Sequence, residues 1–360
     1  MHRIPGKGAQ RGGETPVKKR IVCAGLTLCF FLLFQPQIKT DVKNAVSGAV
    51  REWLGSGTQT DGQPEQEAPT FEQQLGVEQD RSVMDVTLYF RFADTGVLGA
   101  ATAQLDMRRE ETVASSLVQR LIDGPDIAHD RLSGVFPQGT QLLSVTGDGA
   151  TAFVTLNRAF LGKPDGAPSD WEDLAVWQEE AALRRRLAVQ SIVLALTEEG
   201  RYQRVQLYVA DNDDDVPERI PMYWFDPSSG DASMMLAACP RDESVLLTPR
   251  LAMDMILSAW KAQDWQALYP LLARTQEDEM PTLSVFESQM YGLGVSLLDY
   301  TVSDGTVSTD GQSATIVLDA SIRSEEGGDA LIERESVPLV RDADNWAIRL
   351  PTLMSLMIRE

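Results

Sequence analysis

The sequence is poor in the side chains that most catalytic and metal sites need. It has 2 histidines and 3 cysteines in 360 residues, and only His129 and Cys239 lie outside the first thirty positions. One histidine and one cysteine cannot form a standard zinc site, and a lone cysteine allows no disulfide within that part of the chain. No Gly-x-Ser-x-Gly element offers His129 a nucleophile. We therefore expect no catalytic residue, no metal and no cofactor.

Basic residues are also scarce, except at the start of the chain. The formal net charge is -21, yet the first twenty residues carry six lysine or arginine side chains against one glutamate. A strongly acidic remainder argues against binding to nucleic acid or to an anionic lipid surface. Such acidity keeps an exported protein soluble.

One apolar run, Ile21 to Phe34, follows Lys18, Lys19 and Arg20 directly. Positive residues beside an apolar segment stay in the cytoplasm, so the bulk of the chain is expected on the other side of the membrane. No Ala-x-Ala cleavage pattern follows, and Leu28 before Cys29 argues against a lipid-anchored cysteine. We favour an uncleaved single-pass anchor at residues 21–38 behind a cytoplasmic tail of residues 1–20. A cleaved signal segment is the alternative.

Residues 39–80 are expected to be a juxtamembrane segment and a flexible linker. The stretch GSGTQTDGQPEQEAP is rich in Gly, Gln, Thr, Pro and acidic residues and has no apolar period. Such a composition does not bury enough apolar surface to fold by itself.

A first α+β domain is predicted at residues 81–225. MDVTLYFRF alternates apolar and polar residues from Met84 and predicts a strand. The apolar spacing of Val113, Leu117 and Leu121 predicts a helix that Gly124-Pro125 ends. The remaining predicted elements are a hairpin of Gln141 to Thr146 and Ala150 to Leu156, a helix from Asp170 to Glu198 capped by Ser169, and a strand from Arg204 to Ala210.

A connector at residues 226–247 is expected to lead to a second α+β domain at residues 248–360. Thr248-Pro249 suits the start of a helix. Helices are predicted from Ala252 to Leu272 and from Leu283 to Tyr291. Four strands should follow as an antiparallel meander: Val295 to Val302, Ala314 to Arg323, Ala330 to Val340 and Trp346 to Leu350.

Three groups of residues are candidates for contacts with other molecules. Arg184, Arg185 and Arg186 lie together on a predicted helix in an acidic protein, so they could dock an acidic partner; a solvated face with local salt bridges is the alternative. Trp260 and Trp265 could line the mouth of a pocket in the second domain, unless they fill its core. Asp211 to Asp215 lacks the glycine and glutamate of a calcium-hand loop and is interpreted as a solvated turn.

Several motifs of the first domain resemble the GerM N-terminal domain family of sporulation and spore germination. The resemblance covers Met84 to Ala210 and rests on VTLYFRFADTGVLGA, EETVASSLVQRLIDGP, LSGVFPQGTQLLSVTGDGATAFVTLNRAF and AVQSIVLALTEEGRYQRVQLYVAD. The helix end shows the family's Leu-x-x-Gly-Pro pattern at Leu121, Gly124 and Pro125. Two departures are Ala195 in place of a threonine and Asp211 in place of a glycine.

The resemblance implies an α+β fold and a non-enzymatic module of the Gram-positive cell envelope, of a kind often found on membrane-anchored or lipoprotein chains. Its expected partners are envelope or sporulation proteins, or further copies of itself. The second domain more loosely resembles the NTF2-like superfamily, on its helix-then-meander order and on AWKAQDWQALYPLL. The rival hypothesis is an extracellular ligand-binding module that uses a pocket in that cone-shaped domain. A hydrolase built on paired carboxylates is a third reading.

Overall fold

The computed structural model describes residues 82–107, 111–229, 231, 233–274, 280–324 and 328–358. All of these fall within one compact unit, Phe71–Glu360. The predicted tail, anchor and linker at residues 1–80 lie outside the described residues. Among the helices of the described ranges, none is long and apolar enough to cross a bilayer.

The first sheet is built around β1, Ser82–Phe92, which confirms the strand predicted from Met84. β1 pairs antiparallel with β2, Leu98–Met107, on one side and with β3, Leu132–Ser133, on the other. β2 was not predicted, because alanines such as Ala101 and Ala103 are poor strand formers. Its side chains nevertheless alternate between buried and exposed from Ala101 to Met107, as a strand on a core requires.

The second sheet contains the predicted hairpin. β4, Leu142–Asp148, and β5, Thr151–Asn157, are antiparallel and turn through Gly149, whose φ of 57° suits glycine. β6, Arg204–Ala210, has the predicted bounds and runs parallel to β5. Two short strands, β7 at Glu218–Arg219 and β8 at Cys239–Pro240, pair with β6 in the connecting region.

Two helices pack in this half of the unit. α4, Val113–Asp123, confirms the predicted apolar face: Leu117, Val118 and Leu121 are buried, and the Thr112 hydroxyl accepts a hydrogen bond from the Ser115 amide at 3.1 Å. α5, Ala175–Thr197, begins later than the predicted Asp170. A 3-10 turn at Trp171–Asp173 and an extended Leu174 come first, so the expected cap at Ser169 is wrong.

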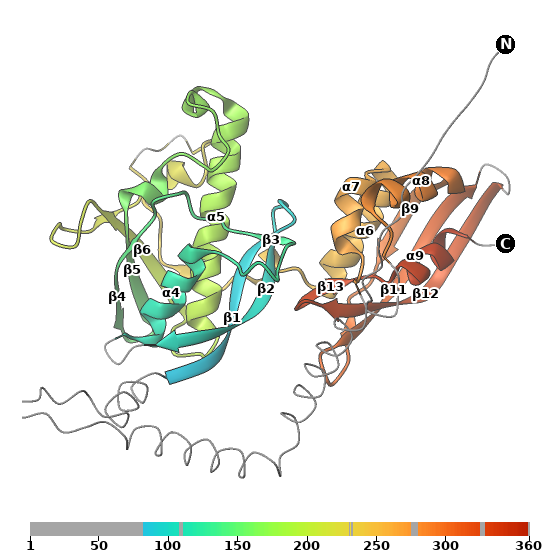
Figure 1. Cartoon of the computed structure of the whole chain (residues 1–360). Coiled ribbons are helices and arrows are strands. Elements are labelled where there is room, and N and C mark those ends of the chain that lie inside the picture. Colours follow the sequence, from blue (N-terminus) through green and yellow to red (C-terminus); the bar gives the residue numbers. More distant parts are fainter. Residues whose placement is uncertain are drawn as a thin grey trace, which may run out of the picture. The chain divides into compact units, whose positions relative to one another are not determined.

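α5 contacts β1 of the first sheet as well as β6 of the second (Figure 1). Because both sheets pack on the helix, residues 187–189 and 191–197 are buried on every side. The Ser191 hydroxyl inside this contact donates to the Tyr89 carbonyl oxygen at 2.6 Å, so its burial costs no hydrogen bond. α5 thus joins the two sheets, and α4 also contacts strands of both.

The C-terminal half begins with helices. α6, Pro249–Ala262, starts where predicted, and the Thr248 hydroxyl accepts from the Leu251 amide at 3.2 Å. The single helix predicted from Ala252 to Leu272 is interrupted at Gln263, whose left-handed φ of 55° ends α6. α7, Trp265–Leu268, a 3-10 turn at Tyr269–Leu271, and α8, Leu283–Leu293, then follow.

An antiparallel sheet follows these helices. It comprises β9 at Val295–Val302, β10 at Thr306–Val307, β11 at Ser313–Ser324, β12 at Gly328–Asp342 and β13 at Asn345–Ala347. β9 and β10 both pair with β11, which pairs with β12, and β12 pairs with β13, as a meander predicts. The strand predicted to reach Leu350 ends earlier, because Pro351 lies in the first turn of an unpredicted helix, α9, Leu350–Met357.

Hydrogen bonds link the two halves within the unit. The Asn345 side chain donates to the Ala100 carbonyl oxygen at 3.0 Å and accepts from the Ala100 amide at 3.1 Å. The buried Arg131 forms an ion pair of 2.6 Å with Asp342 and donates to the Pro270 carbonyl oxygen at 3.1 Å. Each buried polar group in these contacts has a partner, as burial requires.

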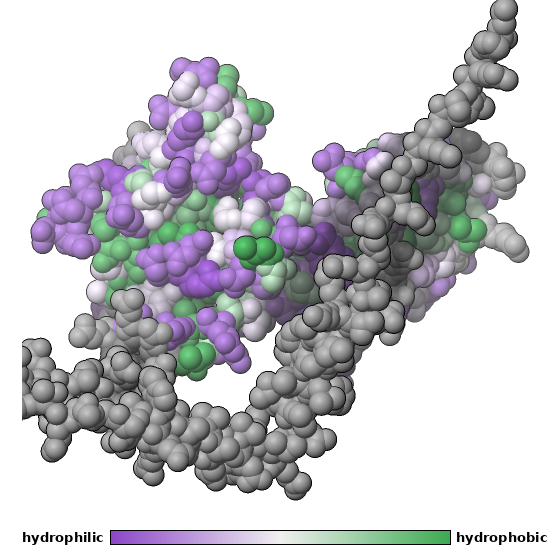
Figure 2. All heavy atoms as spheres, viewed as in Figure 1, coloured by the Kyte–Doolittle hydropathy of each residue, from purple (hydrophilic) through white to green (hydrophobic). Residues whose placement is uncertain are grey.

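The mixture of helices with antiparallel and mixed sheets confirms the α+β class. Hydrophilic residues cover much of the face visible in Figure 2, with hydrophobic residues in small patches between them. The boundaries proposed for the two domains stay predictions.

Leu117→Ala should lower the free energy of unfolding by about 2–5 kcal/mol, because it removes a buried side chain between α4 and the strands. Urea denaturation of the two proteins measures the difference. Gln119→Ala, on the exposed side of the same helix, is the matched control. A Leu117→Ala variant as stable as this control would contradict the assigned core face.

Candidate functional site

The three adjacent arginines of α5 enter three different environments. A helix turns once in 3.6 residues, so neighbouring side chains leave it about 100° apart. The structure places Arg184 in a network of ion pairs, Arg185 in the interior and Arg186 on the surface. The prediction of one docking patch formed by all three is therefore corrected for Arg185.

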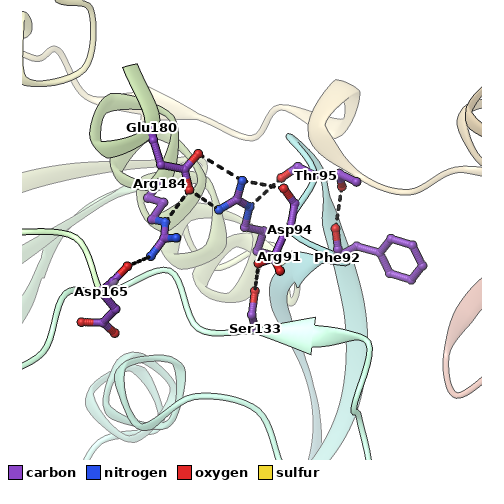
Figure 3. Close-up of polar contacts among 8 residues, drawn as sticks. All are labelled: Arg91, Phe92, Asp94, Thr95, Ser133, Asp165, Glu180 and Arg184. Carbon is purple, nitrogen blue, oxygen red and sulfur yellow. Dashed lines mark hydrogen bonds and ion pairs between the residues drawn. The ribbon is translucent and has the colours of Figure 1, made fainter. Parts of the chain in front are cut away.

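Arg184 belongs to a polar network that fixes α5 to the end of β1 (Figure 3). Its Nε donates to Glu180 Oε1 at 2.6 Å, and one terminal nitrogen donates to the Asp165 carbonyl oxygen at 3.2 Å. The same Glu180 oxygen accepts from the buried Arg91 at 2.5 Å. Arg91 also donates to the carbonyl oxygens of Thr95 and Asp94, at 2.7 and 2.6 Å.

Opposing effects act on the Glu180 carboxyl. Burial raises its pKa, but the hydrogen bonds and charges of Arg91 and Arg184 outweigh burial, so the pKa lies below its ordinary value. Glu180 is therefore ionised at neutral pH and balances the buried charge of Arg91. This network is a structural device, and within it Arg184 already has a carboxylate partner.

Arg185 is only 4 % exposed and makes no ion pair with a described residue. Its terminal nitrogens donate to the carbonyl oxygens of Trp224, Leu161 and Gly162 at 3.2, 2.8 and 3.2 Å. The guanidinium carbon lies 4.8 Å from the ring centroid of Trp224 and 5.7 Å from that of Trp171, within cation–π range. Burial lowers the pKa of Arg185 to about 10, so the group keeps its charge at neutral pH.

Arg186 is exposed and donates to the Phe225 carbonyl oxygen. It borders a hollow of about 570 Å³ that also involves Val176, Leu183 and Asp226. Val176 is 71 % exposed and adds apolar area to this surface. Glu179 and Glu180 line the hollow as well as Asp226. We call Arg186, Val176 and this hollow the α5 surface; it combines charges of both signs with apolar area.

Trp260 and Trp265 lie in the core of the C-terminal half. They are 0 % and 2 % exposed, so neither lines a pocket that opens to solvent. Trp260 donates to the Val295 carbonyl oxygen at 3.3 Å, and Trp265 packs edge-on against Phe286 and Tyr291. The predicted pocket mouth is corrected: the two indoles fill the space between helices and sheet.

The remaining candidates have ordinary roles. His129 Nε2 lies 3.9 Å from Asp344, and Asp211 pairs with Arg158 at 2.8 Å. Asn212 and Asp215 bond to each other across the acidic turn at 2.8 Å. The described residues contain no group of three or more histidine, cysteine, aspartate or glutamate side chains placed to hold a metal ion.

Glu180→Ala should lower the free energy of unfolding by about 1.5–3 kcal/mol at pH 7, because it leaves buried Arg91 without its carboxylate acceptor. Glu179→Ala, at the exposed neighbouring position, should change it by no more than about 0.5 kcal/mol. Urea denaturation measures both.

The Glu180 effect should also depend on pH. Since folding lowers the pKa of Glu180, its contribution is present above the ordinary pKa of 4.5 and is lost as the pH falls through the folded value. The gap between wild type and Glu180→Ala should therefore narrow in acid. A gap that stays constant between pH 7 and pH 3 would show that the carboxylate charge is not the cause.

Comparisons with known proteins point to the same region as the sequence motifs. A family model named Germane, described as sporulation and spore germination, matches residues 87–215. That range agrees with the resemblance found from Met84 to Ala210. No curated protein matches the chain.

Two solved structures resemble part of the chain. The tandem GerMN domains of the sporulation protein GerM from Bacillus subtilis are 17 % identical; the match covers 36 % of this chain and 40 % of that one, with a TM-score of 0.26. The first GerMN domain of the same protein is 16 % identical over 36 % of this chain and 84 % of that one, with a TM-score of 0.23. This chain thus spans less than half of the tandem structure.

The segment from residue 87 to residue 215, which contains α5 and its arginines, is thus the part of the chain that matches the Germane family of sporulation and spore germination domains.

Proposed function

We propose that this chain is a non-enzymatic, membrane-anchored protein of a Gram-positive cell envelope that binds other proteins in sporulation, germination or cell-wall processes. The observation that carries the proposal is the Germane match over residues 87–215. The sequence adds an apolar segment behind a basic tail and an acidic remainder, which together favour export with the bulk of the chain outside the cytoplasm.

The α5 surface is the proposed docking site. Arg186 offers a positive charge in an otherwise acidic protein, and the exposed Val176, about 15 Å away along α5, offers apolar area. A partner surface with an acidic residue about 15 Å from an apolar one would match both features, because charge complementarity steers association and apolar burial adds affinity. The partner can be another envelope or sporulation protein, or a second copy of this chain.

The alternative of a ligand pocket in the C-terminal half loses its support. Its two candidate residues, Trp260 and Trp265, are buried in the core, and each makes aromatic or hydrogen-bond contacts there. The NTF2-like resemblance of that half stays a prediction.

Arg186→Glu should remove crosslinks between this chain and its partners in intact cells, because it reverses the charge of the docking site. Crosslinking followed by mass spectrometry provides the measurement. Arg250→Glu, at an exposed arginine of α6, is the matched control and should keep the crosslinks. Equal crosslink patterns for the two variants would refute docking at the α5 surface, provided that both unfold at the wild-type temperature.

The anchor makes a second prediction. If Ile21 to Phe34 is retained, the protein should fractionate with membranes and resist extraction by high salt, because apolar burial is not screened. Phe30→Arg should impair insertion by about 2.5–3.5 kcal/mol. A soluble protein with a new N-terminus between Gln37 and Val50 would instead show that the segment is cleaved.

A further inference from the structure

A second hollow lies on another side of the arginine triplet. It has a volume of about 330 Å³ and is lined by Trp171, Tyr223, Trp224 and Arg185, with Glu172 and Gln178 among its other lining residues. Three separate segments supply these side chains: the 3-10 turn before α5, α5 itself and the 3-10 turn at Met222–Trp224. Its volume lies within the range of small-molecule sites.

The walls of this hollow are aromatic. The rings of Tyr223 and Trp224 lie 5.0 Å apart at an angle of 32°, and Tyr223 is 42 % exposed. Trp171 contributes from the other segment. Trp171 is only 7 % exposed, so the ring of Tyr223 is the face that offers most area on which a flat group can stack.

One wall of the hollow carries an unbalanced positive charge. The terminal nitrogens of Arg185 bond only to backbone carbonyl oxygens, and its Nε, which is buried, has no hydrogen-bond partner among the described residues. Its contacts with Trp171 and Trp224 offset part of the cost of burying the cation. Glu172 supplies a negative charge, but it is exposed to solvent, which screens it.

A buried charge without a carboxylate partner, together with a donor that bonds to nothing, is costly for folding alone. A carboxylate that entered the hollow would balance the guanidinium charge of Arg185, which lines it, and charge-assisted contacts of this kind are among the strongest in proteins. The aromatic rings would hold the apolar body of the same molecule.

We propose that this hollow is a binding site for a small carboxylate with a flat apolar group next to the acid, such as an acylated aromatic amino acid. The same chemistry occurs at the end of a peptide whose last residue is aromatic. The inference rests on the hollow alone and does not depend on docking at the α5 surface, because Arg186 is not among the residues that line it.

The test is isothermal titration of the full chain, kept in detergent, with N-acetyl-L-tyrosine. Its neutral amide, N-acetyl-L-tyrosinamide, is the matched ligand and should bind about tenfold more weakly, because it lacks the charge that Arg185 recognises. A short peptide that ends in tyrosine with a free carboxylate forms a second arm. Tighter binding of that peptide assigns the natural ligand to a chain end, and tighter binding of the amino acid assigns it to a free metabolite.

Tyr223→Ala removes an aromatic wall at an exposed position, so it should weaken N-acetyl-L-tyrosine binding about tenfold while the protein stays folded. Tyr291→Ala, which removes a tyrosine that is 62 % exposed in α8, is the matched control and should not change the affinity. Arg185→Gln should abolish the preference for the carboxylate over the amide. Thermal unfolding shows whether each variant is folded.

Three results would overturn the proposal. Equal affinity for the carboxylate and the amide would show that Arg185 does not recognise the acid. An unchanged affinity in Tyr223→Ala would place the binding elsewhere. Binding of a neutral trisaccharide of N-acetylglucosamine in place of N-acetyl-L-tyrosine would identify a sugar site. Failure of docking at the α5 surface would leave all of these measurements unaffected.

Discussion

The burial of the C-terminal part of α5 is the constraint on which the first half of the structure depends. From Leu187 to Thr197 every residue except Gln190 is buried, because β1 and its sheet lie against the helix as well as β6 and its sheet. A helix that is buried all round cannot follow an amphipathic pattern, so apolar residues occupy every side of this part. α4 also contacts both sheets, but α5 is the longer of these two helices.

That enclosure determines what happens to the charged residues one or two turns earlier. The rotation from one residue to the next about the helix axis brings Arg184 to the loop at Asp165, Arg185 towards the turns that carry Trp171 and Trp224, and Arg186 to solvent. Arg91 and Glu180 fasten the same stretch to the end of β1. Because the side chains of the enclosed part interlock with both sheets, the helix cannot rotate, and the core therefore fixes the environments of the three arginines.

Local patterns predicted the helices and strands whose apolar residues recur at one fixed spacing. The strands β1, β6 and β9, the hairpin of β4 and β5, and the buried face of α4 all follow from apolar spacing and turn residues. β2 escaped prediction because its core side is built partly from alanine. Gly99 gives a second reason. A side chain there would meet Asn345, a residue 246 positions away that bonds to the backbone of Ala100. No local pattern contains such a contact.

For the candidate sites too, features set by local spacing could be predicted, and features set by contacts between distant residues could not. That Arg184, Arg185 and Arg186 would not all face solvent follows from helix geometry, but which one turns inward depends on packing partners that arrive from residues 161–162 and 224. The tryptophans of AWKAQDWQALYPLL looked suitable for a pocket, yet they fill a core; Trp171 and Trp224, which do line a hollow, lie far apart in the sequence and only the fold brings both to Arg185.

The buried position of Arg185 costs the fold stability but suits the recognition of a carboxylate ligand. A well-packed apolar residue in its place would avoid the cost of burying a charge, and replacing buried charges with apolar side chains often stabilises proteins. Arg184 meets its need for a counter-charge within the chain, through Glu180, whereas Arg185 meets it only through backbone carbonyl oxygens and two rings. The buried Arg185 cation has one unpaired donor and lies beside a hollow that the exposed Tyr223 ring also lines. This arrangement is better suited to reversible binding of a carboxylate than to core packing.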